Sequence, residues 1–164
     1  MPTNTSKKTH RIEDIIQAIY FSLDVRRIED LNIPLFMSRV SEYFNIQLHY
    51  YDSCSEANTL GGDFHIFINQ NQCIQRQWQD FAHELGHILE HEGYQWGIPG
   101  LFRHYQEGQA KKFAHHFCVP SFMLRQFNEI VVSEIVQLFK VEYSFALERL
   151  EMHKNALMEG IRNG

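Results

Sequence analysis

Apolar residues in this 164-residue chain recur at helical spacing over most of its length and alternate with polar residues only near its middle. Helical spacing runs from Ile12 to Leu23. Pro34 suits the first turn of a second helix, which we expect to extend to about Phe44. The residues expected to face the core from this second helix are Leu35, Val40 and Phe44.

The alternating segment predicts a small β-sheet. Apolar and polar residues alternate from Ile46 to Tyr51, and Phe64–Ile68 predicts a second half-buried strand. Residues 52–62 are rich in Ser, Asn and Gly and are expected to form a loop. We therefore expect a sheet of two or three strands, antiparallel or mixed, with His49 and His65 on its surface.

Helical patterns return after this sheet. Beyond the helix described below, a loop is expected at residues 94–104. The helices expected after that loop lie at about 105–119, 122–139 and 143–158. Pro120 ends the first of them, and the second has a candidate break near Asn128. The pattern predicts a disordered N-terminus at residues 1–9 and one α+β domain at 10–164, with a small sheet packed against a helical cluster.

The composition is that of an ordinary globular protein, with 44% hydrophobic and 21% charged residues. The formal net charge of −5 argues against a general affinity for nucleic acid or anionic membrane, because both require a basic surface. The last two expected helices, joined by a short turn, could suggest helix-turn-helix DNA binding. From Glu129 onward, however, six Glu stand against four Lys or Arg, so the charge does not support that interpretation.

The three cysteines are widely spaced and form no C-x-x-C pattern, so they do not indicate disulfides or a thiolate zinc site. We expect Cys54, Cys73 and Cys118 to be free, buried thiols in a reducing cytosol. The polar start shows no signal peptide, and no stretch approaches the roughly 20 apolar residues of a membrane span. These features predict a cytoplasmic protein.

The segment from Gln77 to Glu92, QWQDFAHELGHILEHE, carries an HExxH pattern at its centre. On a helix, His83 and His87 lie only about 40° apart on one face. Both imidazoles can therefore reach one cation at about 2.0–2.1 Å, the usual zinc–nitrogen distance. Glu84 lies beside them, where it can take a proton from water at the metal. The apolar residues expected to be buried on the opposite face are Trp78, Phe81, Leu85, Ile88 and Leu89.

Two glycines bear on this helix. Gly86 costs about 1 kcal/mol relative to alanine in a helix interior, so the close approach of another segment explains it better than helix propensity does. Gly93 suits a C-terminal cap. The alternative is a chance motif on a solvated helix, and the apolar opposite face argues against it.

A catalytic zinc usually has three protein ligands, and Glu107 is the best candidate for the third. On a helix it heads a stripe of small residues, Ala110, Ala114 and Cys118, which would let this helix approach Gly86 closely. The bulky residues beside the stripe, expected to anchor the helix in the core, are Phe113 and Phe117. The alternative for Glu107 is a solvated glutamate at a helix start, where the helix dipole favours it.

Other residues are candidates for the remaining roles. The histidines that compete for the third ligand position are His91, His104, His115 and His116. His91 lies one turn beyond His87 and points along the helix, away from the ligand pair. His115 or His116 could instead stabilise the oxyanion of a tetrahedral intermediate, and the sequence does not choose between them. Candidate substrate contacts are His104 and, if the second strand is an edge strand, Phe64, His65 and Ile66.

At these positions the chain resembles the ImmA/IrrE family of zincin-like metallopeptidases, which phages and mobile elements often carry. The family pattern is a strand ending in Asn, a helix with A-H-E-L-G-H, then E-x-x-A-x-x-F-A and a Pro. Here these features are Phe64–Asn69, Ala82–His87, Glu107–Ala114 and Pro120. Order and spacing match over about residues 46–120.

The resemblance implies a zincin-like domain with His83, His87 and Glu107 as metal ligands and Glu84 as the catalytic acid/base. The implied metal is Zn²⁺, although Mn²⁺ or Fe²⁺ fit the same donors. Family members relieve repression by site-specific cleavage of a partner repressor of the helix-turn-helix type, so the resemblance also implies this substrate class. The chain departs from the family at Lys111, where small polar residues are common, and at His115 and His116, where small or acidic residues are common.

Three functions are open from the sequence. The first is a zinc endopeptidase that cuts one exposed segment of a partner protein. The second is a non-catalytic anti-repressor that binds its partner and uses the metal as structural support. The third is a zinc hydrolase acting on a small substrate, which a deep closed pocket would favour over an open groove.

Overall fold

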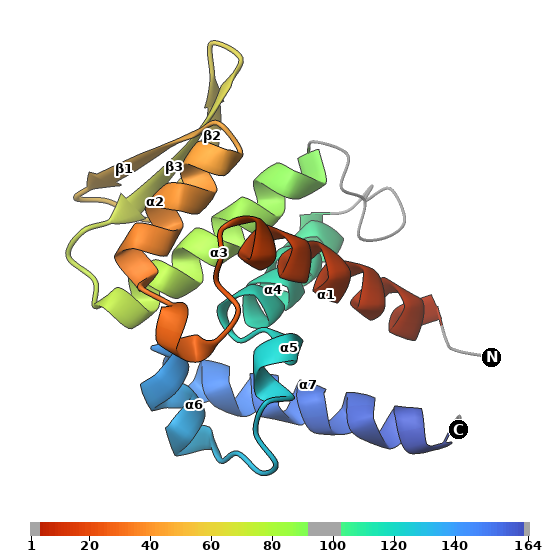
Figure 1. Ribbon diagram of the computed structural model, residues 1–164. Helices are drawn as coiled ribbons and strands as arrows, with labels where there is room; N and C mark the ends of the chain where they lie inside the picture. The colour runs from red at the N-terminus through yellow and green to blue at the C-terminus, as the bar shows by residue number, and fades with distance from the viewer. Residues whose placement is uncertain (1–3, 92–102, 163–164) are drawn as a thin grey trace.

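The structure, a computed structural model, describes residues 4–91 and 103–162 (Figure 1). Its helices are α1 (Asn4–Ser22), α2 (Ile33–Tyr43), α3 (Ile74–His91), α4 (Arg103–Cys118), α5 (Ser121–Leu124), α6 (Val132–Phe139) and α7 (Tyr143–Arg162), with a 3₁₀ turn, η1, at Ile28–Asp30. Its strands are β1 (Ile46–Tyr51), β2 (Glu56–Leu60) and β3 (Asp63–Asn69). The predicted α+β architecture, a small sheet beside a helical cluster, is confirmed.

The sheet is mixed and has the strand order β1-β3-β2, with β1 parallel and β2 antiparallel to β3. One expectation about it was wrong, and one condition for a substrate contact is not met. Strand β2 lies inside the segment 52–62 that was expected to be a loop, and β3 is central, so Phe64–Ile68 is not an edge strand. Four of the five β2 residues are exposed, so the strand has no buried side that would require apolar residues at alternate positions. The missed signal is Gly61-Gly62, whose φ angles of 63° and 94° form the two-residue turn into β3.

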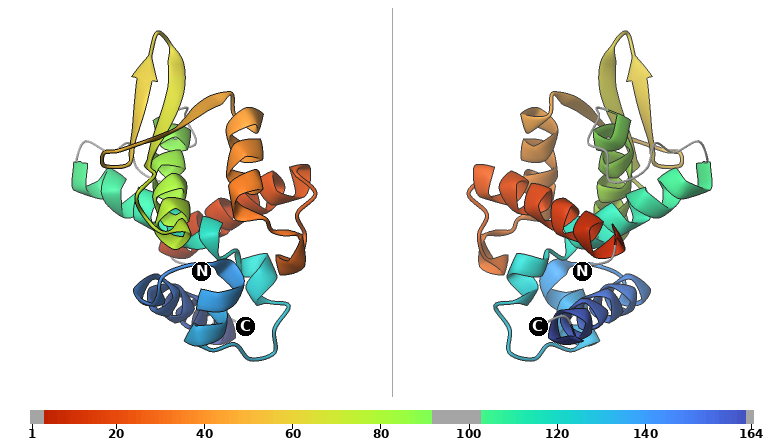
Figure 2. Two further views of the ribbon diagram at one scale, coloured as in Figure 1. Left: turned by 90° about the vertical axis from the view of Figure 1, so that its left-hand side faces the viewer. Right: turned by 90° about the vertical axis from the view of Figure 1, so that its right-hand side faces the viewer.

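The sheet lies at one end of the molecule and α6 and α7 lie at the other (Figures 1 and 2). Helices α3 and α4 run side by side between them, and α3 also packs against β2 and β3. Helix α1 lies against α4, and α2 lies against β1. The motif helix α3 is therefore held between the sheet and the helical cluster.

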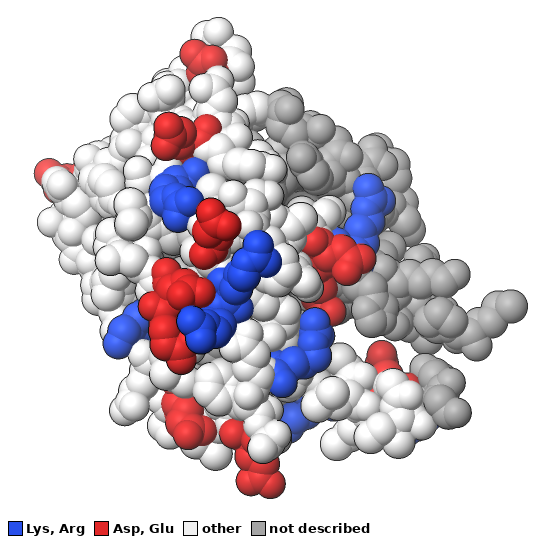
Figure 3. All heavy atoms as spheres, in the orientation of Figure 1, with Lys and Arg blue, Asp and Glu red and all other residues white. Residues whose placement is uncertain are grey.

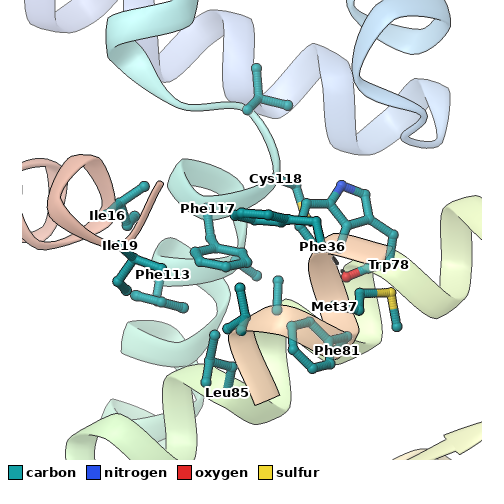
Figure 4. Packing of buried hydrophobic residues seen from close by; sticks show 14 of the residues in the cluster. Ile16, Ile19, Phe36, Met37, Trp78, Phe81, Leu85, Phe113, Phe117 and Cys118 are labelled. Carbon is teal, nitrogen blue, oxygen red and sulfur yellow. Dashed lines mark hydrogen bonds between the residues drawn. The ribbon is translucent and has the colours of Figure 1, made fainter. Parts of the chain in front are cut away.

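An aromatic core fills the space where α2, α3 and α4 meet (Figure 4). Phe36 of α2 stacks on Phe117 of α4 with ring centroids 5.9 Å apart, and Trp78 of α3 lies 5.5 Å from the Phe117 ring. All five apolar residues expected on the inner face of α3 are buried, as predicted. Their burial fixes the rotation of α3 and leaves His83 and His87 on its other side.

Several helix boundaries differ from those expected. Helix α1 begins at Asn4, so residues 4–9 are helical where a disordered segment was expected. The expected helix 122–139 is interrupted at 125–131 and forms two helices, α5 and α6, which confirms the candidate break near Asn128. The expected cap at Gly93 lies outside the described residues, as does most of the expected loop at 94–104. Across the described ranges, no helix combines the length and hydropathy that a membrane span requires.

The orientation of α2 corrects one predicted core residue. Asn32 caps this helix, because its side chain accepts a hydrogen bond from the Leu35 amide at 3.2 Å. Leu35 consequently points outward and is 56% exposed, whereas Phe36, Met37 and Val40 are buried. The helix therefore buries the residues one and two positions after Leu35.

The cysteines are free, but their expected burial holds for only one of them. Cys54 and Cys73 are exposed, and Cys118 is buried. The two exposed thiols lie between β1 and β2 and just before α3, in segments that carry no buried face. Small, weakly polar side chains do not determine burial where the surrounding segment is a surface connection.

Candidate metal centre

The exposed side of α3 directs its two motif histidines to the same point. The Nε2 atoms of His83 and His87 lie 3.2 Å apart, and their rings are nearly perpendicular at 81°. Both side chains remain partly exposed, at 29% and 26%, because the opposite side of the helix is held in the core. The one-turn spacing therefore places two imidazole nitrogens within reach of one ion.

Helix α4 brings a carboxylate to this point. Glu107 Oε2 lies 3.1 Å from His83 Nε2, and Glu107 Oε1 lies 3.1 Å from His87 Nε2. The donor atoms of His83, His87 and Glu107 all lie within 4.8 Å of one another. The third predicted ligand thus reaches the first two from a different helix.

The separations fit a single cation. Donor atoms about 2.0–2.1 Å from a tetrahedral zinc lie roughly 3.3 Å from each other, close to the 3.1–3.2 Å found here. Two imidazoles and one carboxylate are also the donor set of many catalytic zinc sites. Lone pairs of three side chains meet at one point, and a cation between them removes their mutual repulsion.

Close contact between α3 and α4 makes this convergence possible. A Cβ atom at Gly86 would lie 3.3 Å from the Ala110 Cα and 3.0 Å from the Phe113 Cδ1. Phe113, which was expected to lie to one side, therefore packs directly over the glycine. Farther along the interface, the Cys118 thiol lies 3.7 Å from the Trp78 carbonyl oxygen. The small residues set the helix spacing that lets the α4 carboxylate reach the α3 histidines.

Glu84 lies beside the candidate metal ligands and next to the sheet. Burial raises the pKa of its carboxyl to about 7; a hydrogen bond from the Ala57 backbone opposes this rise, and the Asp80 and Glu107 carboxylates add to it. A cation at the centre would favour the carboxylate and lower this pKa. Ala57 belongs to β2, so the edge of the sheet lies next to Glu84.

The centre opens into a groove. A cleft of about 620 Å³ is lined by His83 and Glu84 of α3 and by Glu107 and Lys111 of α4, and it reaches as far as α7. A second hollow of about 300 Å³ lies between β2 and α3 and includes His87 in its wall. Open space on both sides of the ligands suits an extended chain better than a small enclosed molecule.

Charges near the cleft are balanced by neighbours of opposite sign. Arg76 Nε lies 3.1 Å from Asp80 Oδ1, and Lys111 Nζ lies 2.7 Å from Glu148 Oε2. On the face drawn in Figure 3, Lys and Arg side chains are interspersed with Asp and Glu, without a broad basic area. That face therefore lacks the basic surface that nucleic acid requires.

His115 lies in the wall of the cleft but away from the ligands. Its Nδ1 donates a hydrogen bond to the Lys111 carbonyl oxygen at 2.8 Å, and the side chain is only 2% exposed. Burial lowers its pKa. Eight residues separate it from Glu107, about 12 Å along a helix axis. This position does not support the predicted contact with an oxyanion at the metal.

His116 points into the helical cluster instead. It is 3% exposed, and its Nδ1 lies 3.5 Å from Glu13 Oε1 of α1. Burial, with the Arg149 guanidinium next in effect, lowers its pKa to about 2. It is absent from the wall of the cleft, so an oxyanion role is not supported for this residue either. The side chains of His91 and His104 lie outside the part of the chain that the structure describes.

The three β3 residues proposed as substrate contacts occupy different places. Ile66 is fully buried, so it faces the core. His65 lies on the outer sheet surface, where its Nδ1 is 2.9 Å from His49 Nε2, as expected of surface histidines. Phe64 lines the smaller hollow with His87. Because β3 is central, none of them presents a free strand edge, and the edge strand beside the centre is β2.

Comparison with known proteins agrees with this geometry. The Peptidase M78 family, described as the IrrE N-terminal-like domain, matches residues 29–151, which include α3 and α4. The phage-like element PBSX protein XkdA of Bacillus subtilis (strain 168) is 33% identical over 146 residues, covering 86% of this chain and 72% of that protein. YqaB of the same organism is 32% identical over 153 residues, covering 90% of this chain and 87% of that protein. The chain belongs to the IrrE N-terminal-like peptidase family.

Proposed function

We propose that this protein is a zinc-dependent endopeptidase that cuts a partner protein at one exposed segment. The observation that carries the proposal is the meeting of His83, His87 and Glu107 at donor separations of 3.1–3.2 Å, beside Glu84. Membership of a peptidase family supports peptide-bond hydrolysis as the reaction. Manganese or iron would fit the same donors, and metal analysis of the purified protein would identify the ion.

In this proposal, three residues bind the metal and Glu84 transfers protons. His83, His87 and Glu107 would hold the ion at the cleft. Zinc would supply a Lewis acid there, lowering the pKa of a water molecule to near 7 and polarising the scissile carbonyl. Glu84 accepts a proton from the attacking water and then delivers a proton to the leaving amine. The hydrogen bond from the Ala57 amide fixes the Glu84 carboxyl for both transfers.

The position of the edge strand β2 supports the proposal that the substrate is a peptide. The strand pairs with β3 on one side and lies next to Glu84 on the other. An extended segment of the partner can add to this edge through main-chain hydrogen bonds, which places its backbone across the centre. The groove on both sides of the ligands leaves room for the chain to continue in each direction.

We propose a helix-turn-helix repressor of a phage or mobile element as the partner. The similar protein XkdA is named as a protein of a phage-like element, which supports this setting. The family resemblance supports the repressor class. Cleavage of a repressor places the activity in the cytoplasm, and the net charge of −5 suits contact with the repressor protein rather than with DNA.

A non-catalytic anti-repressor is the second candidate. It is favoured by the direct contacts of Glu107 with both histidines, which can join α3 to α4 as a structural centre whether or not hydrolysis follows. In that case the partner would bind to the groove and remain intact.

The variant Glu84→Gln separates the two candidates. Zinc-loaded wild type and variant are incubated with a panel of phage-type helix-turn-helix repressors, and fragments are identified by mass spectrometry. We expect one discrete cut by the wild type, at least about a 100-fold lower rate in the variant, and equal zinc content. Release of a repressor from its operator by Glu84→Gln, without fragments, would instead establish the binding function.

A further inference from the structure

An apolar recess lies at the end of the cleft remote from the metal ligands. Its wall is formed by Ala114 and His115 of α4 and Phe145 of α7. The Phe145 ring stacks on His115 with centroids 4.0 Å apart and an interplanar angle of 6°. His115 covers one face of the Phe145 ring, and the ring remains partly exposed and lines the cleft.

The charged groups around this recess already have partners. Lys111 bonds to Glu148 at 2.7 Å at the rim. On the α3 side, Arg76 lies 3.1 Å from Asp80 and 3.5 Å from Glu142. A charged substrate side chain would have to displace one of these pairs, whereas an apolar side chain gains by covering the aromatic ring.

The distance from the metal centre limits which substrate residue can occupy the recess. Seven residues separate Glu107 from Ala114, which is about 10 Å along the axis of α4. An extended peptide advances about 3.3 Å per residue. A peptide that follows the axis of α4 from the centre would therefore reach the recess about three residues from its scissile bond.

We propose that this recess is a specificity subsite that takes a large apolar side chain, such as Leu, Met or Phe, within three residues of the cut. This inference rests on the proposed peptidase function. Ala114 and Phe145 set the size of the accepted side chain, and the ion pairs at the rim select against charge.

Binding of peptide hydroxamates tests the subsite without turnover. The hydroxamate group binds zinc and carries a tripeptide of glycine on one side or on the other, which gives two series of probes. In each series, one of the three glycines is replaced by Phe or by Lys, at each position in turn. Affinities for the zinc-loaded protein are measured by calorimetry. We expect Phe at one position to bind about tenfold more tightly than Gly, from burial of its ring, and Lys at that position to give no gain.

One pair of variants locates the gain. Phe145→Ala should remove it, while Leu147→Ala, at a 40% exposed position of α7 outside the cleft, should keep it.

The outcomes separate the subsite from the peptidase function. Equal affinity for the Phe and Lys probes, or a gain that survives Phe145→Ala, would overturn the subsite. If the gain is present but no repressor is cut, the subsite stands and the peptidase function fails. Cleavage without the gain removes the subsite alone, and a protein that binds no zinc contradicts both.

Discussion

Two of the places where the described residues bring histidine and glutamate together from different helices differ in their chemistry, and only one of the two is suited to a metal. In the candidate centre, Glu107 contacts His83 and His87 at 3.1 Å. In the other, His116 lies 3.5 Å from Glu13. We call the second group the buried polar cluster, and it consists of Glu13, His116, Ser121 and Arg149.

The clusters differ in how their acceptors are satisfied. In the buried polar cluster, Ser121 Oγ donates to Glu13 at 2.5 Å, and Arg149 donates to Ser121 Oγ at 2.8 Å and to the Val119 carbonyl at 3.0 Å. In the candidate centre, the acceptor atoms of three side chains face one another at an open groove. A contact between histidine and glutamate therefore indicates a metal site when several acceptor atoms converge on one point. It does not indicate one when those acceptor atoms already accept hydrogen bonds from protein donors.

The largest expected difference between the clusters is in zinc affinity. Glu107→Gln removes a negatively charged donor from the centre, so zinc affinity should fall by more than about 100-fold, with loss of detectable cleavage. Glu13→Gln, the matched change in the buried polar cluster, should leave zinc affinity unchanged. Competition with a chromophoric chelator measures both, and equal affinities for the two variants would contradict the assignment of Glu107.

Arg149→Met should show the opposite pattern, with lower stability and normal zinc binding. Arg149 is fully buried, and burial lowers its pKa to about 10, so it remains charged at neutral pH. Its removal leaves the Val119 carbonyl without this donor in the core, and the free energy of unfolding should fall by about 2–3 kcal/mol. Urea unfolding measures the change, with Arg162→Met at an exposed position as control. Loss of zinc binding in a folded Arg149→Met would mean that the clusters are coupled.

Gly86→Ala should affect the spacing between α3 and α4. The added methyl group meets Phe113 at 3.0 Å and the backbone of Ala110 at 3.3 Å, so we expect a loss of about 1–2 kcal/mol despite better helix propensity. Gly108→Ala, where a Cβ meets nothing within 4 Å, should instead raise stability by about 0.5–1 kcal/mol. Equal gains from the two substitutions in urea unfolding would show that the helices are not closely apposed at Gly86.

The candidate centre could be predicted from sequence because its signals are local. The spacing of His83 and His87 on one helix, and the small residues that follow Glu107 on another, depend only on helix geometry. Gly86 then indicated that the two helices meet. The family resemblance strengthened the same assignment.

The buried polar cluster and the edge strand could not be predicted in this way. Arg149 lies within a charged helix, and only the tertiary structure shows that it bonds to the Val119 carbonyl 30 residues away. Strand β2 gains its pairing from β3 and buries little, so its sequence carries almost no hydrophobic pattern. The sequence offers His115 and His116 as alternatives for one role, but adjacent residues on a helix differ by about 100°, which points them to different surroundings.

The last effect we predict is the acid sensitivity of the buried polar cluster. The pKa of His116 is lowered to about 2 in the folded protein, by burial and then by Arg149, Lys112, His115 and His153. The Glu13 carboxylate faces it from α1 without restoring its basicity. The unfolded chain, with an ordinary histidine pKa near 6.5, therefore binds the proton more readily, and stability falls as the pH drops below about 6.5.

Between pH 7.5 and 5.5 this histidine should account for a loss of about 1.4 kcal/mol, which His116→Gln should remove. Urea unfolding of metal-free wild type and variant at both pH values measures the difference, and groups common to both proteins cancel in it. The metal ligands are among those common groups, so the comparison isolates the buried polar cluster from the centre. An identical pH dependence in the two proteins would mean that His116 binds its proton as readily in the folded protein as in the unfolded chain.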